Sequence, residues 1–402
     1  MKARVLAWVG AILVVGCAYA SPGDGMDLRI APPKIAFGDW RRLSETETTV
    51  EYAIEFPSPV ATPYPVNNRV PIRALLPQGT EGPMPVVVVL HYWGASDQRV
   101  DVALAQELNS RGVAAVLVTL PYHLSRTPPG ATSGQYAIEP DPPKMRRTME
   151  QSVLDVRRTV DWIASRPEFD TNKIGLAGTS LGAIVGATAY AVEPRFAAAS
   201  FVLGGADLAH ILWHSSRVVQ QREVLRGAGY LEGSLRDELS SIEPLTYLSE
   251  RRPAPVFLVG ARYDSVIPPA DTEKLRAALP GSQILWVDTG HYGGVFVQRK
   301  ILRLVAEFEG AALEGRPFSA PERIYAPTLR IGVEMNSARG LQVAAGIDLW
   351  RTSPKAEGFA TFLVTPKGAE VFLGHTISNG FAVGFVAKPS GISLGAFWST
   401  IL

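Results

Sequence analysis

The feature that most constrains the fold is a series of short apolar runs that alternate with helical patterns between residues 85 and 313. The run VVVVL at residues 86–90 is continuous and β-branched, as expected for a strand buried on both faces. Comparable runs lie at residues 112–120, 173–177, 197–203, 255–260 and 283–287. We therefore predict an α/β fold, in which a mostly parallel sheet carries helices on both faces.

The surrounding patterns outline one large domain. Two further strands are expected before the alternating region, at residues 48–56 and 69–76. Residues 206–252 are mainly helical in pattern and longer than a plain crossover between strands, which predicts a cap-like insertion. We assign residues 48–320 to the α/β domain. Its other helices are expected at residues 97–111, 146–166, 181–191, 270–279 and 294–313.

The last part of the chain, residues 325–402, has a different pattern. Apolar and polar residues alternate with a period of two, and turn sequences such as Asn379-Gly380 and Pro389-Ser390-Gly391 recur. This pattern predicts a separate antiparallel β module of about six strands. Because single-chain barrels that span membranes have at least eight strands, we expect this module to be soluble.

The N-terminus has the pattern of an export signal. Lys2 and Arg4 precede an apolar stretch at residues 5–16, which is too short to span a membrane comfortably. Cys17, the only cysteine, ends a stretch that resembles a bacterial lipobox, whereas Ala18-Tyr19-Ala20 fits ordinary cleavage. We expect residues 1–20 to hold a signal peptide or a lipoprotein signal, and residues 21–47 to form a tether or an irregular lead-in. The protein is expected to be periplasmic or secreted, or attached to the outer membrane through Cys17, which in the lipobox reading is lipidated and becomes the new N-terminus.

Composition excludes several classes of protein. Hydrophobic residues make up 47% of the chain, which is enough for a sizeable core. Lys and Arg total 39 against 38 Asp and Glu, a balance that offers no broad surface for nucleic acid. No coenzyme or acyl-carrier motif is visible, so no cofactor is expected, and the sequence does not set the oligomeric state.

A serine between two glycines is the first candidate for chemistry. Gly178-Thr179-Ser180-Leu181-Gly182 matches G-x-S-x-G and lies between a predicted buried strand and a predicted helix. At such a joint the serine is held up on a sharp turn, and the helix N-terminus points its N–H groups toward developing negative charge. A plain turn serine is the alternative, but the flanking elements favour a nucleophile.

A serine hydroxyl needs a base to take its proton and an acid to orient that base. The order along the chain in this kind of fold is serine, acid, histidine. His291 lies in a loop after the last predicted strand, and Asp264 follows the strand before it. We predict Ser180, Asp264 and His291 as the catalytic residues, with Asp207 as the second choice for the acid. Loops at the carboxyl ends of parallel strands meet at one sheet edge, so these residues can meet.

Two backbone N–H groups are needed for the oxyanion of such a reaction. The residue after the nucleophile, Leu181, supplies one. The other is expected from the loop after the VVVVL strand, where Trp93 is the first choice and Tyr92 the second. We expect His91 to stiffen this loop through hydrogen bonds and not to act as the general base.

Several stretches together resemble the α/β-hydrolases. They are LHYWG, DVRRTVDWIASRPEFDTNKIGLAGTSLGA, RYDSVIPP and GHYGG, and the resemblance covers about residues 48–313. Within that superfamily the chain is most similar to the dienelactone-hydrolase and acetyl-esterase-like branches. The resemblance implies the same triad and oxyanion residues. Tyr92 stands where the family usually has a glycine, Leu181-Gly182-Ala183 replaces a common double glycine, and the β module has no counterpart in the core family.

Other polar residues lie where substrate could bind. His210, Trp213 and His214 fall in the cap-like segment, where we expect their side chains to line the substrate pocket. Tyr122 and His123 follow a predicted strand, and they either reach the substrate or pack within their own loop. Asp207, His210 and His214 share a helical face, but no fourth ligand with convincing spacing is visible, so no metal site is expected.

We therefore expect a serine hydrolase that cleaves a small-molecule carboxylic ester through an acyl-enzyme. The alternatives are a peptidase or thioesterase of the same fold, or a non-catalytic envelope lipoprotein that kept the fold.

Overall fold

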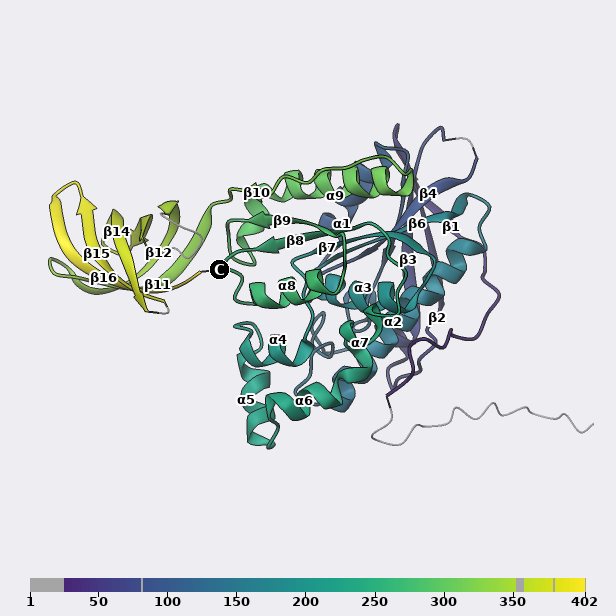
Figure 1. Ribbon diagram of the computed structural model, residues 1–402, viewed down its shortest axis with the longest axis horizontal. Coiled ribbons are helices and arrows are strands. Elements are labelled where there is room, and N and C mark those ends of the chain that lie inside the picture. The colour runs from purple at the N-terminus through teal and green to yellow at the C-terminus, as the bar shows by residue number, and fades with distance from the viewer. Residues whose placement is uncertain (1–24, 81, 352–357, 379, 402) are drawn as a thin grey trace, which may run out of the picture.

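The computed structural model describes residues 25–80, 82–351, 358–378 and 380–401 (Figure 1). Cys17 and the expected signal segment lie outside the described residues. A ten-stranded sheet forms the larger part of the molecule, in the order β1-β2-β3-β5-β4-β6-β7-β8-β9-β10. Its strands are β1 (Arg41–Glu45), β2 (Thr49–Pro57), β3 (Arg69–Pro77), β4 (Met84–Leu90), β5 (Ala114–Val118), β6 (Phe169–Thr179), β7 (Phe196–Val202), β8 (Val256–Ala261), β9 (Gln283–Val287) and β10 (Arg323–Ile324).

The sheet is antiparallel at one edge and parallel elsewhere. Strands β1, β2 and β3 pair antiparallel with one another, and β3 pairs antiparallel with β5. From β5 to β10 every neighbouring pair is parallel. The predicted mostly parallel α/β sheet is therefore confirmed, and the carboxyl ends of β4, β6, β8 and β9 lie at the same edge.

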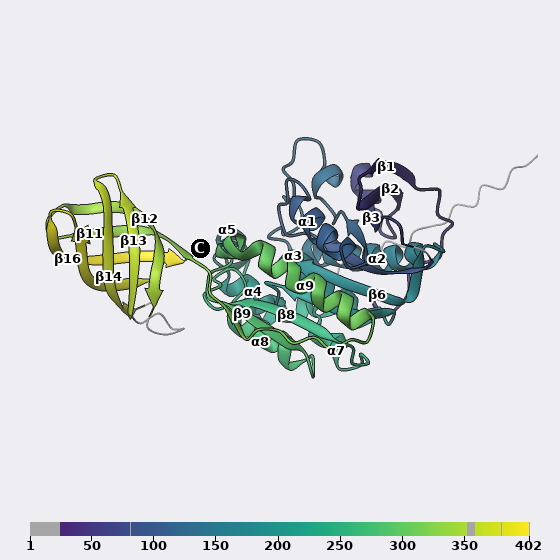
Figure 2. The same cartoon turned by 90° about the horizontal axis from the view of Figure 1, so that it is seen from above.

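Helices cover both faces of this sheet. The side chains of Val86, Val88 and Leu90 belong to one core cluster and those of Val87 and Val89 to another, so β4 is buried on both sides, as its sequence predicts. Helices α2 and α3 pack on the first face, and α1 and α9 on the second (Figure 2). The helices of the sheet region are α1 (Arg99–Asn109), α2 (Pro142–Ala164), α3 (Leu181–Val192), α8 (Pro269–Ala277) and α9 (Gln298–Leu313).

A helical segment follows β7 and returns to β8. It contains α4 (Leu208–His214), α5 (Val219–Gly227), α6 (Glu232–Glu238) and α7 (Leu245–Leu248). Helix α4 contacts α6, and α6 contacts α2, so the segment covers one end of the α2 side of the sheet. Short 3-10 turns complete the fold: η1 (Pro65–Asn68), η2 (Leu124–Arg126), η3 (Ser240–Ile242) and η4 (Gly293–Val297).

The segment before the α/β region packs on it, which fits the irregular lead-in of the two alternatives and not a free tether. Leu28 is fully buried in the core of the α2 side. Arg157 on α2 donates hydrogen bonds to the carbonyls of Leu28 and Ile30, at 2.6 and 2.8 Å. Trp40 stacks on Tyr52 of β2. The Pro- and Gly-rich composition indicated irregular backbone but carried no periodic signal for these contacts.

The C-terminal strands form a closed antiparallel barrel beside the larger domain (Figures 1 and 2). It closes because β11 pairs with both β12 and β16. Phe359, Leu363, Phe372, Val386 and Phe397 fill its interior. The strands are β11 (Thr328–Asn336), β12 (Gly340–Arg351), β13 (Gly358–Thr365), β14 (Gly368–Ser378), β15 (Phe381–Lys388) and β16 (Gly391–Ile401), six as predicted.

In the part of the chain that the structure describes, no helix combines the length and the apolar character needed to cross a membrane.

Candidate active site

Ser180 sits on a tight turn between β6 and α3. Its backbone has φ 54° and ψ −113°, a strained conformation for a residue with a side chain. The flanking glycines make this turn possible: a Cβ on Gly178 would lie 2.2 Å from the Gly182 carbonyl oxygen, and one on Gly182 would lie 2.3 Å from that of Leu90. The Ser180 N–H donates to Val202 of β7 at 2.8 Å, which ties the turn to the sheet.

The structure brings together the three side chains predicted from the sequence. Ser180 Oγ lies 3.0 Å from His291 Nε2, and His291 Nδ1 lies 2.7 Å from Asp264 Oδ2. A carboxylate can only accept, so Nδ1–H donates to Asp264 and Nε2 is left to accept the serine proton. Both His291 and Asp264 are buried, whereas Ser180 is half-buried and reachable from the cavity described below.

Asp264 is held in place by the backbone that follows it. Its Oδ1 accepts N–H bonds from Val266 and Ile267, both at 2.8 Å, while Oδ2 faces His291. These two bonds fix the carboxylate in the orientation that holds the imidazole. The carboxyl ends of β8 and β9 lie side by side in the sheet, which is why residues 264 and 291 meet.

The backbone N–H groups of Leu181, Tyr92 and Trp93 have no acceptor among the described residues. Leu181 opens α3, and the other two lie in the loop after β4. Because Gly182 packs directly on the Leu90 carbonyl, this loop lies against the serine turn. The three predicted oxyanion donors are therefore near the serine and available to a ligand.

His91 holds the loop after β4, as predicted. Its Nδ1–H donates to the Tyr92 carbonyl at 2.9 Å, and its Nε2 accepts the Leu120 N–H at 3.0 Å. Burial lowers the pKa of His91 to about 3, so the ring is neutral and keeps both bonds. With both nitrogens occupied, His91 is not free to act as a base.

An apolar cavity of about 70 Å³ opens beside Ser180. Among the described residues that line it, Ser180, Ser215 and Arg217 contribute the polar side chains apart from the indole of Trp93. The Arg217 guanidinium lies 5.1 Å from the centre of the Trp93 ring and is exposed, so the one charge is at the surface. The apolar lining is Ala137, Ile138, Met145, Met149, Leu181, Ile184, Leu208, Ile211, Leu212, Val218, Leu239, Ile242, Val266 and Ile267.

Six of these apolar lining residues, together with Ser215 and Arg217, come from the predicted cap, but they are not the ones that we expected. Helix α4 turns Leu208, Ile211 and Leu212 toward the cavity. His210, Trp213 and His214 do not line the cavity, and their contact with substrate stays a prediction. The apolar stripe of α4 is what faces the cavity, since residues three and four apart share a helix face.

Tyr122 and His123 are also outside the cavity lining. His123 is fully buried, with Nδ1 2.8 Å from the Pro121 carbonyl and its ring against His91. Tyr122 packs edge-on to Tyr64 and Tyr136. These contacts match the alternative in which the two residues pack within the loop, and their contact with substrate stays a prediction.

His210 and His214 instead form a small cluster with Glu232 of α6. Their possible ligand atoms all lie within 4.8 Å of one another, and Asp271 accepts from His210 Nδ1 at 2.8 Å. These three side chains are the described residues that could hold a divalent cation. Asp207, the second choice for the catalytic acid, forms ion pairs with Lys274 and Arg236 and not with His291.

Helix α2 contributes cavity-lining residues that were not predicted from the sequence. Met145 and Met149 lie four apart on one face of α2, and both line the cavity. The helical spacing of Met149 is visible in the sequence, but a buried core position has the same signature. Arg217 gave no signal, because it lies in an irregular stretch between α4 and α5.

Comparison with known proteins agrees with this architecture. Residues 67–240 match the model of a family described as X-Pro dipeptidyl-peptidase (S15 family). No curated protein matches the chain. The acetyl xylan esterases of Paenibacillus sp. R4 and Thermoanaerobacterium sp. JW/SL YS485 are similar in structure. Both have a TM-score of 0.53 and are 19% and 16% identical; the alignments cover 67% of this chain and 88% and 87% of theirs.

A third similar structure is the acylaminoacyl peptidase of Pyrococcus horikoshii. Its TM-score is also 0.53, it is 16% identical, and the alignment covers 69% of this chain and 44% of that one. At these identities the likeness shows the fold and not the substrate. The chain therefore has an α/β-hydrolase fold, followed by the closed C-terminal barrel.

Proposed function

We propose that this protein is a serine hydrolase that cleaves carboxylic esters with an apolar acyl group. The observation that carries the proposal is the hydrogen-bonded chain from Ser180 through His291 to Asp264, beside an apolar cavity. The acetyl xylan esterases of similar fold support an ester as the substrate class.

The geometry supports the following reaction. His291 Nε2 takes the proton of Ser180 Oγ as this oxygen attacks the acyl carbon, and Asp264 stabilises the resulting imidazolium. The N–H groups of Leu181 and of Trp93 or Tyr92 bind the oxyanion. The C–O bond to the alcohol breaks, and the alcohol leaves with the proton from His291. Water then attacks the acyl-enzyme by the same route and releases the acid.

The cavity supports an apolar acyl chain. Each buried methylene contributes about 0.8 kcal/mol, which corresponds to about a fourfold change in affinity. We therefore expect kcat/KM for p-nitrophenyl esters to rise about fourfold for each added carbon until the cavity is filled. A series from acetate to dodecanoate tests this expectation, and a flat or falling series from acetate onward would contradict it.

The test of the nucleophile is Ser180→Ala with p-nitrophenyl butyrate. Loss of the nucleophile lowers kcat by roughly 10⁴- to 10⁶-fold. Ser110→Ala is the matched control, because Ser110 is an exposed serine at the end of α1. A fluorophosphonate probe labels wild type and the control but not Ser180→Ala. Absence of labelling in wild type would favour the non-catalytic envelope protein instead.

A peptidase is the second candidate, because the matched family is described as X-Pro dipeptidyl-peptidase. Release of a dipeptide requires a group that binds the free α-ammonium of the substrate. Among the described residues that line the cavity none is a carboxylate, and the one charge is the cation Arg217. Apolar ester substrates therefore fit this cavity better. Hydrolysis of an X-Pro p-nitroanilide faster than of p-nitrophenyl butyrate would favour the peptidase.

We also propose that the protein is exported and that Cys17 is its lipid attachment point, on the basis of the N-terminal sequence. Mass spectrometry of the mature N-terminus distinguishes an acylated Cys17 from cleavage after Ala20.

A further inference from the structure

The outer surface of the C-terminal barrel is apolar on all six strands. Residues that point outward include Ile331 on β11, Leu341 on β12, Phe362 on β13, Leu373 on β14 and Phe385 on β15. On β16, Ile392 and Trp398 are 75% and 70% exposed. The other exposed large apolar side chains of the barrel are Val333, Met335, Val343, Ile347, Leu349, Trp350, Val364, Ile377, Val383 and Leu394.

Charged side chains of the barrel point the opposite way. Arg330 and Asp348 form a buried ion pair at 2.8 Å. Glu334 and Glu370 are also buried, and both accept hydrogen bonds from Gln342, at 2.6 and 3.0 Å. The other barrel residues with described Asp, Glu, Lys or Arg side chains are at the strand ends or in turns: Arg339, Lys367 and Lys388.

This arrangement is the reverse of that of a soluble β domain. In water, alternating strands place apolar side chains inside and polar ones outside. Here the strands alternate with apolar residues outside and buried charges among the residues inside, which is the pattern of strands that face lipid. The expectation of a soluble module rested on strand number alone, and the direction of the alternation argues against it.

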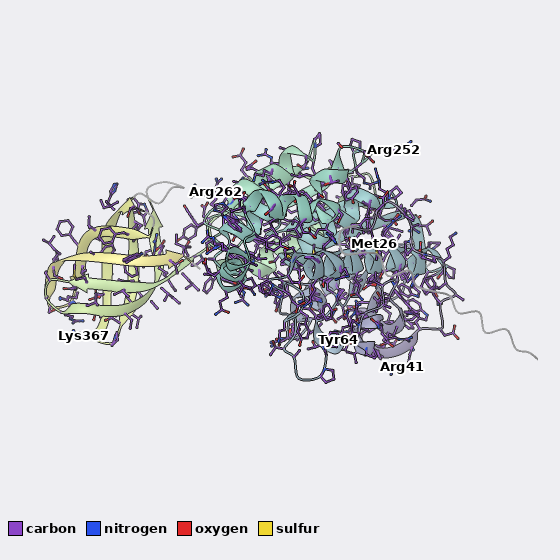
Figure 3. The ribbon with its side chains drawn as sticks, turned by 90° about the horizontal axis from the view of Figure 1, so that it is seen from below. Met26, Arg41, Tyr64, Arg252, Arg262 and Lys367 are labelled. Atoms are coloured by element: carbon purple, nitrogen blue, oxygen red, sulfur yellow. The ribbon has the colours of Figure 1, made fainter. Side chains whose placement is uncertain are left out.

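We propose that the outer surface of this barrel inserts into a lipid bilayer and anchors the hydrolase to it. The strands contain eight to twelve residues, and a tilted strand needs about nine to eleven to cross the hydrocarbon layer. The basic residues Arg339 and Lys367 lie at the end away from the α/β domain, where phosphate head groups would meet them; Figure 3 labels Lys367 there.

Lipid explains the surface better than a second copy of the chain. A dimer interface covers one side of a barrel, and the apolar residues here extend around all six strands. Lipid can surround the whole circumference. Because Phe359, Phe372 and Phe397 fill the interior, the barrel acts as a solid anchor and not as a pore.

The test uses the full chain with Cys17→Ala, so that no acyl chain is attached, and vesicles of phosphatidylcholine. We expect the protein to float with the vesicles in a density gradient. Val343→Arg and Phe385→Arg place a charge on the outer surface, and each is expected to lower the floating fraction about tenfold or more. Val224→Arg, at an exposed position on α5, is the matched control.

Turnover of p-nitrophenyl butyrate by every variant is measured in the same samples, which separates this proposal from the proposed activity. Because Val343 and Phe385 are already exposed, arginine at either position is compatible with a folded barrel. Flotation that both substitutions leave unchanged would overturn the proposal, as would wild-type protein that stays at the bottom of the gradient.

A second readout detects contact with the acyl chains directly. Phosphatidylcholine brominated on its acyl chains should quench Trp398, and Trp398→Phe should remove that part of the quenching. Trp162→Phe is the control, because Trp162 is fully buried in α2. Self-association without lipid, combined with no loss of quenching in Trp398→Phe, would show that the surface binds a second copy instead.

Discussion

Asp264 and Asp207 follow neighbouring strands, and their hydrogen bonds separate their roles. Asp264 faces His291, whereas Asp207 pairs with Lys274 and Arg236. Asp264→Asn presents an amide to the imidazole and disfavours the tautomer with a proton on Nδ1. We expect kcat for p-nitrophenyl butyrate to fall by roughly 10³- to 10⁴-fold. Asp207→Asn should keep kcat within threefold, and equal losses in the two variants would contradict this assignment.

The glycines of the serine turn are needed for steric reasons and take no part in the reaction. Gly182→Ala places a methyl group against the Leu90 carbonyl, and we expect a loss of roughly 1–3 kcal/mol in the free energy of unfolding. Gly233→Ala on α6 meets no atom within 4 Å and should gain about 0.5–1 kcal/mol. Urea unfolding followed by circular dichroism measures both changes. A Gly182→Ala protein as stable as wild type would refute the close approach.

Glu309 predicts how stability depends on pH. It is buried on α9 with a single hydrogen bond, from Ser200 Oγ at 2.6 Å, and burial raises its pKa to about 8. The unfolded chain ionises this group near pH 4.5. Its contribution is therefore fully present below pH 4.5 and is lost as the pH rises toward 8.

Glu309→Gln cannot ionise, so the fall in Tm between pH 5 and 8 should be smaller than in wild type. Glu307→Gln, at an exposed position on the same helix, should leave the profile unchanged. Thermal unfolding at pH 5, 6, 7 and 8 measures this difference, and parallel profiles for wild type and Glu309→Gln would contradict it.

At the scale of elements, α4 sets the size of the cavity. Ile211 faces the cavity and Trp213 does not. Ile211→Trp should fill part of the cavity and lower kcat/KM for octanoate esters at least about tenfold relative to acetate esters. A methylene-sized change in an apolar pocket alters the transition-state binding energy by roughly 1–3 kcal/mol. Trp213→Phe should leave this ratio unchanged. The ratio of kcat/KM values for the two esters is the measurement, and a shift in the control alone would reverse the assignment.

The elements themselves could be predicted, but the faces that they present could not. The short, β-branched run at residues 86–90 favours a buried strand over a helix, so β4 was predictable. Ser180, Asp264 and His291 were predictable because they follow runs of this kind. The rotation of α4 about its axis depends on packing against α6. The sequence therefore suggested polar residues such as His210 as the cavity lining, whereas Leu208 and Ile211 line it.

At the scale of the whole molecule, the barrel and the site are linked through one loop. Thr289 donates to the Pro327 carbonyl at 3.2 Å, and Thr328 donates to the Asp288 carbonyl at 3.1 Å. The turn η4 that follows His291 exposes Val295 and Phe296. If the barrel enters lipid, this apolar surface lies beside it.

We therefore expect Phe296→Lys to lower hydrolysis of a diacylglycerol ester held in phosphatidylcholine vesicles, about threefold or more. Hydrolysis of dissolved p-nitrophenyl butyrate should stay within twofold of wild type. Val219→Lys, an exposed apolar position on α5, is the control for added charge. An equal decrease on both substrates would show that Phe296 acts on the site itself and not on the membrane surface.

The closure of the barrel and the direction of its alternation were not predictable from the sequence. The period-two pattern of β11 and β12 gave the strands and their number. Which set of alternate residues faces inward depends on the pairing of β11 with β16, more than 50 residues apart. From the sequence alone, Ile331 could therefore face inward and Glu334 outward, or the reverse.

The central claim is that His291 and Asp264 make the Ser180 hydroxyl a nucleophile. Rapid mixing with excess p-nitrophenyl butyrate, acid quenching and peptide mass spectrometry test it most directly. We expect a butyryl group on the peptide that contains Ser180. This group should be absent from Ser180→Ala, and in His291→Ala it should form at least about a thousandfold more slowly. Ester turnover at the wild-type rate in Ser180→Ala, or a butyryl group on another residue, would contradict it.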